Sequence, residues 1–534
     1  MKANNSKRVL YVAIVVTLGG FIFGLDVALI SGTVDFLKVE FGLSEFEKGL
    51  IASASAWGAL VALPLASVIS ERLGRKSALI MVAALYVVSA VSSTFATSFN
   101  TLFAARFLGG LAFSSLSLAS MYIGEVSPPK MRGKLVSLNQ INIGVGLLAA
   151  YCINYIILHG ANSGADWAIS LGVDQHTWRW MLGVEIIPAT IWLILLFTIP
   201  KSSRWLLYKS RVEEAKKVLF RLLPSATGEQ ITEMEVNAKV ISIQKSIENE
   251  GVKGSAWSQL KELFTPRLRK VLLIGVSIAL AQQITGINAI KYYAPSLFEQ
   301  LGIGRDSAFM SAIWVGLSSF LATLLSLAFI DRLGRKPIAI GGIAMMVICL
   351  GVCSYGFKSA TYTISNNALV QLEEIPNVSA LKPLENKTFY SDVNFKKALK
   401  EALGEQEAHK YASLILQKTA NINSILILIG VILFVAAYNF SLGPIMWVLL
   451  SEIVPTSLRS GVIPFFALIT ALVSAFAQNL FPWQLEVLGA GNTFLIFMAF
   501  GVVGFVLLNR NLVETKNKPI EEIEAELIGM SKKK

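Results

Sequence analysis

Charged residues are scarce in this sequence. Only 15% of its 534 residues are Asp, Glu, Lys or Arg, whereas a soluble domain carries roughly 25%. A Gly-x-x-x-x-Gly-Lys-Ser/Thr phosphate-binding loop is absent, which argues against an ATP-driven pump. The three cysteines, Cys152, Cys349 and Cys353, all fall in apolar runs without metal-ligand spacing, so buried free thiols are expected. The sequence therefore indicates neither a soluble enzyme nor a protein that needs a cofactor or a metal.

The positive charge of the chain has two interpretations. Its formal net charge is +12, and a basic balance is one feature of nucleic-acid-binding proteins. However, 54% of the residues are hydrophobic and they gather in runs. Lys and Arg collect on the cytoplasmic loops of membrane proteins, which explains the charge better. No nucleic-acid partner is expected.

Twelve apolar runs are long enough to cross a bilayer, because a helix needs about 20 mostly apolar residues to do so. The first run follows Lys2, Lys7 and Arg8 as a signal peptide would, but it lacks a small-x-small cleavage site. We therefore expect it to be retained as a helix. The predicted spans are 9–31, 49–70, 77–97, 101–123, 135–158, 180–199, 270–299, 308–330, 337–357, 422–450, 462–484 and 491–511.

The basic loops lie on one side of the predicted membrane. Segments 71–76, 130–134, 201–270 and 331–336 and the Lys-rich C-terminal tail all fall on this side. Because Lys and Arg favour cytoplasmic loops, both termini are predicted to be cytoplasmic. No organelle signal is present, so a multi-pass protein of a bacterial inner membrane is the default localisation.

Two loop motifs occur twice. Residues 71–76 return as 331–336, 260 residues later, and residues 125–132 return as 452–459, 327 residues later. Each copy occupies the same loop of its half, which predicts two pseudo-symmetric halves of six helices. The second offset exceeds the first by 67 residues. An insertion is therefore predicted in the second half, at about 358–421.

The predicted fold is an all-α membrane protein, with twelve transmembrane helices arranged as in the major facilitator fold. The predicted parts are the first half at 1–199, a cytoplasmic linker with short helices at 200–269, the second half at 270–511 and a cytoplasmic tail at 512–534. The 358–421 insertion is predicted to be extracytoplasmic, with a helix at 395–403. A tolerated loop-tip insertion is the simpler interpretation, and a gate-covering or partner-binding cap is the alternative.

Three charged residues lie inside predicted spans of the first half. Asp26 is in the first span, Arg106 in the fourth and Glu185 in the sixth. A charge inside the membrane is costly unless it is paired or functional. A buried carboxylate beside an arginine can exchange between its ionised and protonated forms, as proton coupling requires. A static ion pair is the alternative.

The seventh span carries polar side chains on a helix that Gly286 and Pro295 weaken. These polar residues are Gln282, Gln283, Asn288 and Tyr292. A broken helix that lines a cavity suits this pattern. Carboxamides and phenols can bind the hydroxyls of a sugar. Packing of a polar stripe against another helix is the alternative.

The repeated basic loops predict a latch at the cytoplasmic face. Gly74 and Gly334 allow tight turns, and the charges beside them can bridge neighbouring helix ends. Such bridges would hold one face closed and break when the halves move. Alternatively, the charges only stop the helices at the interface. The expected latch residues are Glu71, Arg72, Gly74, Arg75, Glu125, Arg132, Asp331, Arg332, Gly334, Arg335, Glu452 and Arg459.

These residues together resemble the sugar porter family of the major facilitator superfamily, most closely its bacterial proton-coupled xylose and hexose symporters. The motifs that carry the resemblance include Asp26, the two repeated loops, Gln282–Asn288, Gly443-Pro444 and Glu514-Thr515-Lys516. The resemblance implies that a sugar is contacted by Gln140, Gln282, Gln283, Asn288 and Tyr292. It also implies that Asp26, Arg106 and Glu185 couple transport to protons, since passive relatives usually carry Asn in place of Asp26.

The predicted sugar site departs from the family pattern. Groups that would stack on a sugar or hydrogen-bond to it are replaced at Leu147, Ser319, Leu442, Thr470 and Ala471. Lys291 adds a charge beside Tyr292 where relatives are apolar. The substrate is therefore left open, and neither glucose nor xylose is assumed.

The leading hypothesis is a monomeric, proton-coupled transporter of a sugar or polyol that works by alternating access within the lipid bilayer. Passive facilitation, or transport of another small organic solute on the same scaffold, is the alternative. A sugar sensor is disfavoured, because sensors of this family carry long tails and only 24 residues follow Arg510.

Overall fold

Twelve long helical segments dominate the structure. The computed structural model describes residues 2–127, 129–222, 232–250, 256–373, 375–455 and 458–528. Within these ranges, twelve helical segments are long and apolar enough to cross a membrane, and each overlaps one of the predicted spans. An all-α membrane fold is thereby confirmed.

The first half contains six spans with two short helices between them. The spans are α1 (Lys2–Ser31), α3 (Glu45–Leu73), α4 (Arg75–Thr94), α5 with α6 (Phe99–Leu111, Ser115–Val126), α7 (Pro129–Ser163) and α9 with α10 (Thr177–Gly183, Ile186–Leu196). The short helices are α2 (Val34–Phe41) and α8 (Asp166–Ser170). A 3-10 turn, η1 (Ala112–Ser114), interrupts the fourth span, and the sixth breaks just before Ile186. Sequence analysis predicted neither interruption, although Glu185 lies at the second of them.

Four short helices connect the two halves. They are α11 (Ser203–Tyr208), α12 (Val212–Leu222), α13 (Glu233–Glu250) and α14 (Ala256–Leu263), which the 3-10 turn η2 (Pro266–Leu268) follows. The first three share a small apolar core that contains Leu206, Leu219 and Val236. The fourth packs against the second half, on α26.

The second half contains the other six spans. They are α15 with α16 (Arg269–Gln283, Ile287–Tyr292), α18 (Arg305–Leu333), α19 (Arg335–Lys358), α24 with α25 (Ser424–Phe440, Leu442–Ile453), α26 (Arg459–Val487) and α27 (Gly489–Asn511). The short helix α17 (Ala294–Glu299) follows α16, and α28 (Ile520–Ile528) follows the last span. The seventh span is broken where its sequence predicted a break. Gly286 has a φ of 76° between α15 and α16, and this left-handed conformation strains any residue with a side chain.

The insertion between α19 and α24 folds around a core of its own. Its elements are β1 (Thr361–Thr363), α20 (Asn366–Gln371), η3 (Val378–Leu384), β2 (Thr388–Phe389), α21 (Asp392–Leu403), α22 (Glu405–Lys410), α23 (Ala412–Thr419) and β3 (Ala420–Asn421). The strands form a small antiparallel sheet in the order β2-β1-β3. The buried core includes Tyr362, whose ring stacks on Phe395, together with Leu381 and Ile415.

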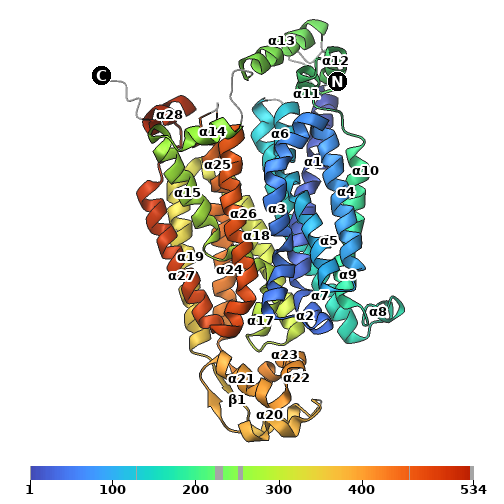
Figure 1. Cartoon of the computed structure of the whole chain (residues 1–534), viewed down its shortest axis with the longest axis vertical. Coiled ribbons are helices and arrows are strands. Elements are labelled where there is room, and N and C mark those ends of the chain that lie inside the picture. Colours follow the sequence, from blue (N-terminus) through green and yellow to red (C-terminus); the bar gives the residue numbers. More distant parts are fainter. Residues whose placement is uncertain are drawn as a thin grey trace.

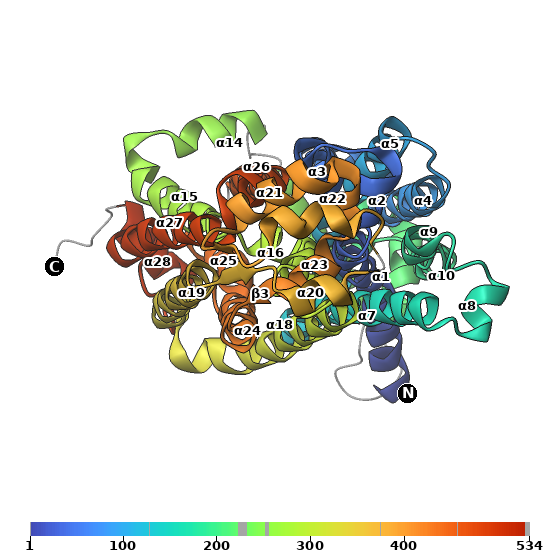
Figure 2. The ribbon, with the colours of Figure 1, turned by 90° about the horizontal axis from the view of Figure 1, so that it is seen from below.

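The two halves stand side by side, and the connecting segments gather at opposite ends of the bundle. The two termini and α11–α13 lie at one end, which we call the terminal end, and the insertion lies at the other, the insertion end (Figure 1). The halves pack along α3 and α26 and along α7 and α18. Viewed from the insertion end, α20–α23 lie across the middle of the bundle (Figure 2).

Candidate functional site

A buried ion pair joins α1 to α5. Nη2 of Arg106 donates to Oδ2 of Asp26 at 3.0 Å, and Nη1 contacts the other carboxylate oxygen. Each side chain is only 1% exposed. A bidentate pair of this kind compensates both charges inside the protein. The structure therefore brings together two of the three residues that were predicted to couple transport to protons.

The third of these residues, Glu185, lies near the pair but does not contact it. Its side chain is buried at the break between α9 and α10. Among the described residues, its carboxylate has no hydrogen bond or ion pair. Arg106 is nevertheless close enough to interact electrostatically with Glu185. Tyr292 on α16 in turn lies within electrostatic range of Asp26 and Arg106. The charged group of the first half therefore adjoins the broken helix of the second.

The break in the seventh span gathers amide side chains. Nδ2 of Asn288 donates to Oε1 of Gln283 at 3.0 Å and to Oγ of Ser474 at 2.7 Å. Nε2 of Gln478 donates to the same serine oxygen at 2.7 Å. Nε2 of Gln282 lies 3.4 Å from each of two backbone carbonyls at the start of α25. We call Gln282, Gln283, Asn288, Ser474 and Gln478 the amide cluster.

Sequence analysis missed part of this cluster. Ser474 and Gln478 are four residues apart, on one face of α26, and an i, i+4 polar pair inside an apolar run is the signal that could have found them. Gln140 was predicted to contact the same ligand, and it lies on α7 in the other half, where it is partly buried. Within the described ranges it makes no hydrogen bond to the amide cluster.

The repeated loops make equivalent ion pairs at the terminal end. Arg75 pairs with Glu125 at 2.9 Å in the first half, and Arg335 pairs with Glu452 at 2.9 Å in the second. Arg335 also pairs with Asp331 at 3.0 Å. Gly74 and Gly334 turn the chain with φ values of 91° and 96°. Each pair therefore ties helix ends within one half.

For several other predicted latch residues, the described part of the structure shows no side-chain ion pair. Nε of Arg459 donates to the backbone carbonyl of Val454 at 3.1 Å. The side chains of Glu71, Arg72 and Arg332 are exposed, and the described residues offer them no ion pair. The side chain of Arg132 falls outside the described part of the structure.

Two polar residues that were not predicted as latch residues lie beside the Arg335–Glu452 pair. Glu514 accepts the backbone N–H groups of Arg335 and Lys336, each at 3.0 Å, and so caps the start of α19. Oγ1 of Thr515 donates to Glu452 at 2.6 Å. The segment after the last span therefore fixes one latch pair.

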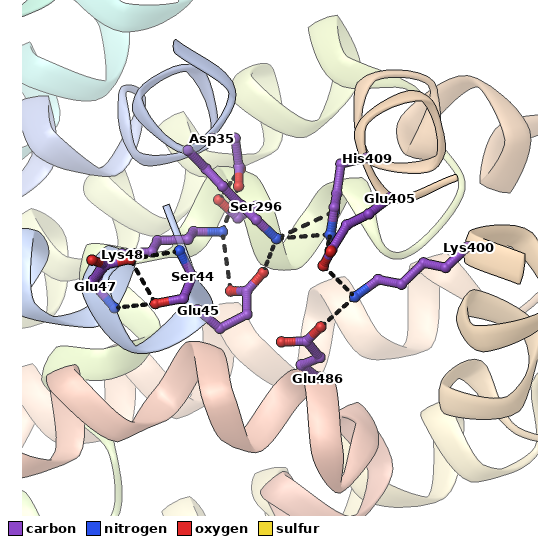
Figure 3. A network of polar contacts seen from close by, with 11 residues as sticks. Asp35, Ser44, Glu45, Glu47, Lys48, Ser296, Lys400, Glu405, His409 and Glu486 are labelled. Atoms are coloured by element: carbon purple, nitrogen blue, oxygen red, sulfur yellow. Dashed lines mark hydrogen bonds and ion pairs between the residues drawn. The ribbon is translucent and has the colours of Figure 1, made fainter. Parts of the chain in front are cut away.

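A second polar network lies at the insertion end and joins three parts of the chain (Figure 3). Lys38 on α2 contacts Glu45 on α3 and places its Nζ 3.0 Å from Nε2 of His409 on α22. Lys400 on α21 pairs with Glu486 on α26. The insertion is therefore tied to the first half through α22 and to the second half through α21. Sequence analysis missed this network.

Contacts between the halves themselves surround that network. Asp35 on α2 pairs with Lys48 and accepts a hydrogen bond from Ser296 on α17. Nδ2 of Asn162 on α7 donates to Asp306 on α18 at 2.7 Å. Side chains from both halves therefore contact one another at the insertion end.

One group at this end has the chemistry of metal ligands. Among the described residues, Glu45, His409 and Glu486 offer ligand atoms within 4.8 Å of one another. Lys38 contacts the first two, and Lys400 pairs with the third. Ammonium groups therefore already compensate the carboxylates, and we assign no metal to this group.

Comparison with known proteins identifies the family. The family model described as Sugar (and other) transporter matches residues 12–372 and 408–527. The chain belongs to this sugar transporter family. The residues between the two matched segments, 373–407, fall inside the insertion.

This sugar transporter resembles its relatives along its whole length. It is 31% identical over 524 residues to the Arabinose-proton symporter of Bacillus subtilis (strain 168), with 98% of this chain and 96% of the relative covered. It is 30% identical over 555 residues to the D-xylose-proton symporter of Escherichia coli (strain K12), with the same shares covered. Among solved structures, the partially occluded inward open conformation of the xylose transporter XylE from E. coli gives a TM-score of 0.71 at 27% identity, covering 96% of this chain and 100% of that chain. The family and fold expected from the sequence motifs are confirmed.

Proposed function

We propose that this sugar transporter takes up a sugar or sugar derivative together with protons by alternating access. The observation that carries the proposal is the buried Asp26–Arg106 pair, which lies close to Tyr292 on α16. The same helix contributes Asn288 to the amide cluster. The buried ion pair of the first half thus lies close to the helix of the second half that carries part of the amide cluster. The relatives named as arabinose-proton and D-xylose-proton symporters support the same function.

In this proposal Asp26 is the group that carries the proton. While it is ionised, its carboxylate compensates Arg106. Protonation removes that compensation, and Arg106 is then attracted to Glu185, the other buried acid within its electrostatic range. The movement of Arg106 away from α1 would change the packing beside Tyr292. Proton binding would in this way be coupled to the sugar site.

The amide cluster is the proposed sugar site. Carboxamides offer both donors and acceptors, and sugar hydroxyls need both. Oε1 of Gln478 is buried without a hydrogen-bond partner among the described residues, so one acceptor of the cluster is available to a ligand. Gln140 and Tyr292 would complete the site from the first half and from α16.

The membrane orientation follows from the basic loops in this proposal. The terminal end would face the cytoplasm, because Lys and Arg favour that side. The insertion end would then face outwards, and the Lys38–His409 and Lys400–Glu486 contacts would help to keep it closed. A monomer in a bacterial cell membrane is the simplest assembly. The insertion would serve as a cap over the outer end.

Uptake of radiolabelled sugars into proteoliposomes tests the function. We expect an inward proton gradient to drive accumulation of at least one sugar above equilibrium, and we expect a protonophore to abolish it. Uptake that only equilibrates would favour a passive facilitator and reduce Asp26 to a structural role. Absence of uptake across neutral and acidic sugars would contradict the proposal.

A further inference from the structure

Lys291 is a buried lysine that the proposed proton and sugar sites do not use. It lies on α16, one residue before Tyr292, and is 9% exposed. Its Nζ is 3.3 Å from Oδ1 of Asn439 and 5.0 Å from the centre of the Tyr438 ring. Within the described ranges no Asp or Glu oxygen lies within ion-pair distance of this nitrogen. The lysine therefore has no anionic partner there.

These contacts satisfy an ammonium group only in part. An ammonium has three N–H donors, and here one amide oxygen and one aromatic face receive it. Cations inside membrane helices are normally paired or placed at a functional site. By contrast, the buried cations Arg106 and Lys48 pair with the carboxylates of Asp26 and Asp35, respectively. Lys291 thus has unused capacity to bind an anion.

The surroundings of Lys291 connect it to the amide cluster. The Tyr438 hydroxyl lies close to Gln283, which accepts a hydrogen bond from Asn288. The hydroxyl of Tyr151, on α7 of the first half, donates to the backbone carbonyl of Lys291 at 2.7 Å. The backbone of this lysine is therefore held at the junction of the halves. Its side chain lies over the ring of Tyr438, which neighbours the cluster.

We propose that Lys291 binds the carboxylate of an acidic sugar, such as an aldonate or a uronate, while the amide cluster binds the hydroxyls. This inference rests on the proposed function and names its substrate class. A single ammonium suits one negative charge. A phosphate ester carries about 1.5–2 negative charges and usually meets several cations or an arginine fork. A carboxylate-bearing sugar therefore fits this site better than a sugar phosphate.

The proposal has a consequence for the charge that crosses the membrane. A neutral sugar moved with one proton transfers one positive charge, whereas a monoanionic sugar moved with one proton transfers none. An imposed membrane potential should therefore drive the first process and leave the second nearly unchanged. The two substrate classes can be distinguished by this property alone.

Uptake by the purified full-length protein in proteoliposomes provides the test. The probes are glucose and glucuronate, which differ only in the oxidation of C6, and galactose and galacturonate as a second matched pair. We expect an inward proton gradient to drive uptake of at least one acid more than tenfold faster than its neutral partner. A potassium diffusion potential should change the uptake of that acid less than twofold.

Two variants remove the anion site in different ways. Lys291→Met keeps an unbranched side chain that is one atom shorter and removes the charge. Asn439→Asp keeps Lys291 but gives it an internal carboxylate. Both should lower the ratio of acidic to neutral sugar uptake at least tenfold, and Lys291→Arg should lower it less. Because Asn439→Asp adds a partner to a buried charge, it tests the proposal even if Lys291→Met fails to fold.

The outcomes distinguish a failure of the Lys291 anion site from a failure of the proposed function. Proton-driven uptake of neutral sugars alone would overturn the role of Lys291 and leave the proposed function intact. An unchanged ratio in the two charge-neutralising variants would also overturn it. No uptake of any sugar, neutral or acidic, would overturn the proposed function and this inference with it.

Discussion

The ammonium of Lys38 lies 3.0 Å from Nε2 of His409, so the first half of the bundle directly contacts the insertion of the second. Partial burial and the positive charges of Lys38 and Lys400 lower the pKa of His409 to about 4. A neutral imidazole can accept a hydrogen bond from Lys38, whereas a protonated one would repel it. This contact is therefore sensitive to pH.

Acid should weaken the docking of the insertion. His409 has its ordinary pKa near 6.5 when it is released and about 4 when it is docked, so the released form binds more protons between these values. Docking is therefore fully favoured above about pH 6.5, and its stability is lost progressively as the pH falls towards 4. The other charged groups that face His409 are Glu45, Lys400, Glu405 and Glu486.

Distances between spin labels would measure this effect. We expect labels at the exposed positions Val39 on α2 and Val370 on α20 to separate in a larger fraction of molecules at pH 5 than at pH 7.5. His409→Gln keeps a neutral hydrogen-bonding group and should reduce the pH dependence in this range. Identical distance distributions at both pH values would contradict the assignment.

Asp26→Asn should uncouple transport from protons. The amide has nearly the shape of the carboxylate and can still accept a hydrogen bond from Arg106, but it cannot be protonated in the working pH range. We expect gradient-driven accumulation to fall to equilibrium, while exchange of labelled for unlabelled sugar continues. Accumulation equal to that of the wild type would show that Asp26 is not the coupling group.

Arg75→Ala should destabilise the terminal end of the first half, and Arg72→Ala serves as its matched control. Arg75 pairs with Glu125, and both side chains are largely buried. Removing a hydrogen bond to a charged group costs about 1.5–3 kcal/mol. Arg72 is exposed, and the described residues offer it no ion pair, so its loss should change stability by less than about 0.5 kcal/mol. Thermal unfolding in detergent would measure both, and equal effects would contradict a specific role for the Arg75–Glu125 pair.

Gly286→Ala should damage the break in the seventh span. The left-handed backbone at this position costs a residue with a side chain roughly 1–2 kcal/mol. The added Cβ would also lie 2.5 Å from the ring of Phe497. Gly341→Ala is the control, because a Cβ there meets nothing within 4 Å and alanine favours a helix. We expect lower thermal stability and slower uptake in Gly286→Ala but not in Gly341→Ala. Equal stability and uptake in the two variants would contradict this prediction.

The membrane fold follows from local features of the amino-acid sequence. Apolar runs longer than a bilayer is thick have few alternatives to a transmembrane helix, because the backbone must satisfy its own hydrogen bonds in lipid. The twelve spans and the break at Gly286 could therefore be predicted from local composition, and the recurrence of 71–76 at 331–336 indicated the two halves. The insertion was located from the difference of 67 residues between the offsets of the two repeated motifs.

Tertiary structure alone decided which polar groups meet. Ser474 lies 186 residues from Asn288, and His409 lies 371 residues from Lys38, so no local pattern could pair them. The same holds for Lys291, whose sequence context indicated an extra charge but not its partner Asn439, 148 residues away. Hydrophobic runs specify each helix separately, whereas side-chain partners depend on how the helices pack. The candidate proton pair could be predicted because a charge inside a membrane span is costly. The contacts at the insertion end could not, because their charged residues lie outside the predicted spans, where the sequence gives no such signal.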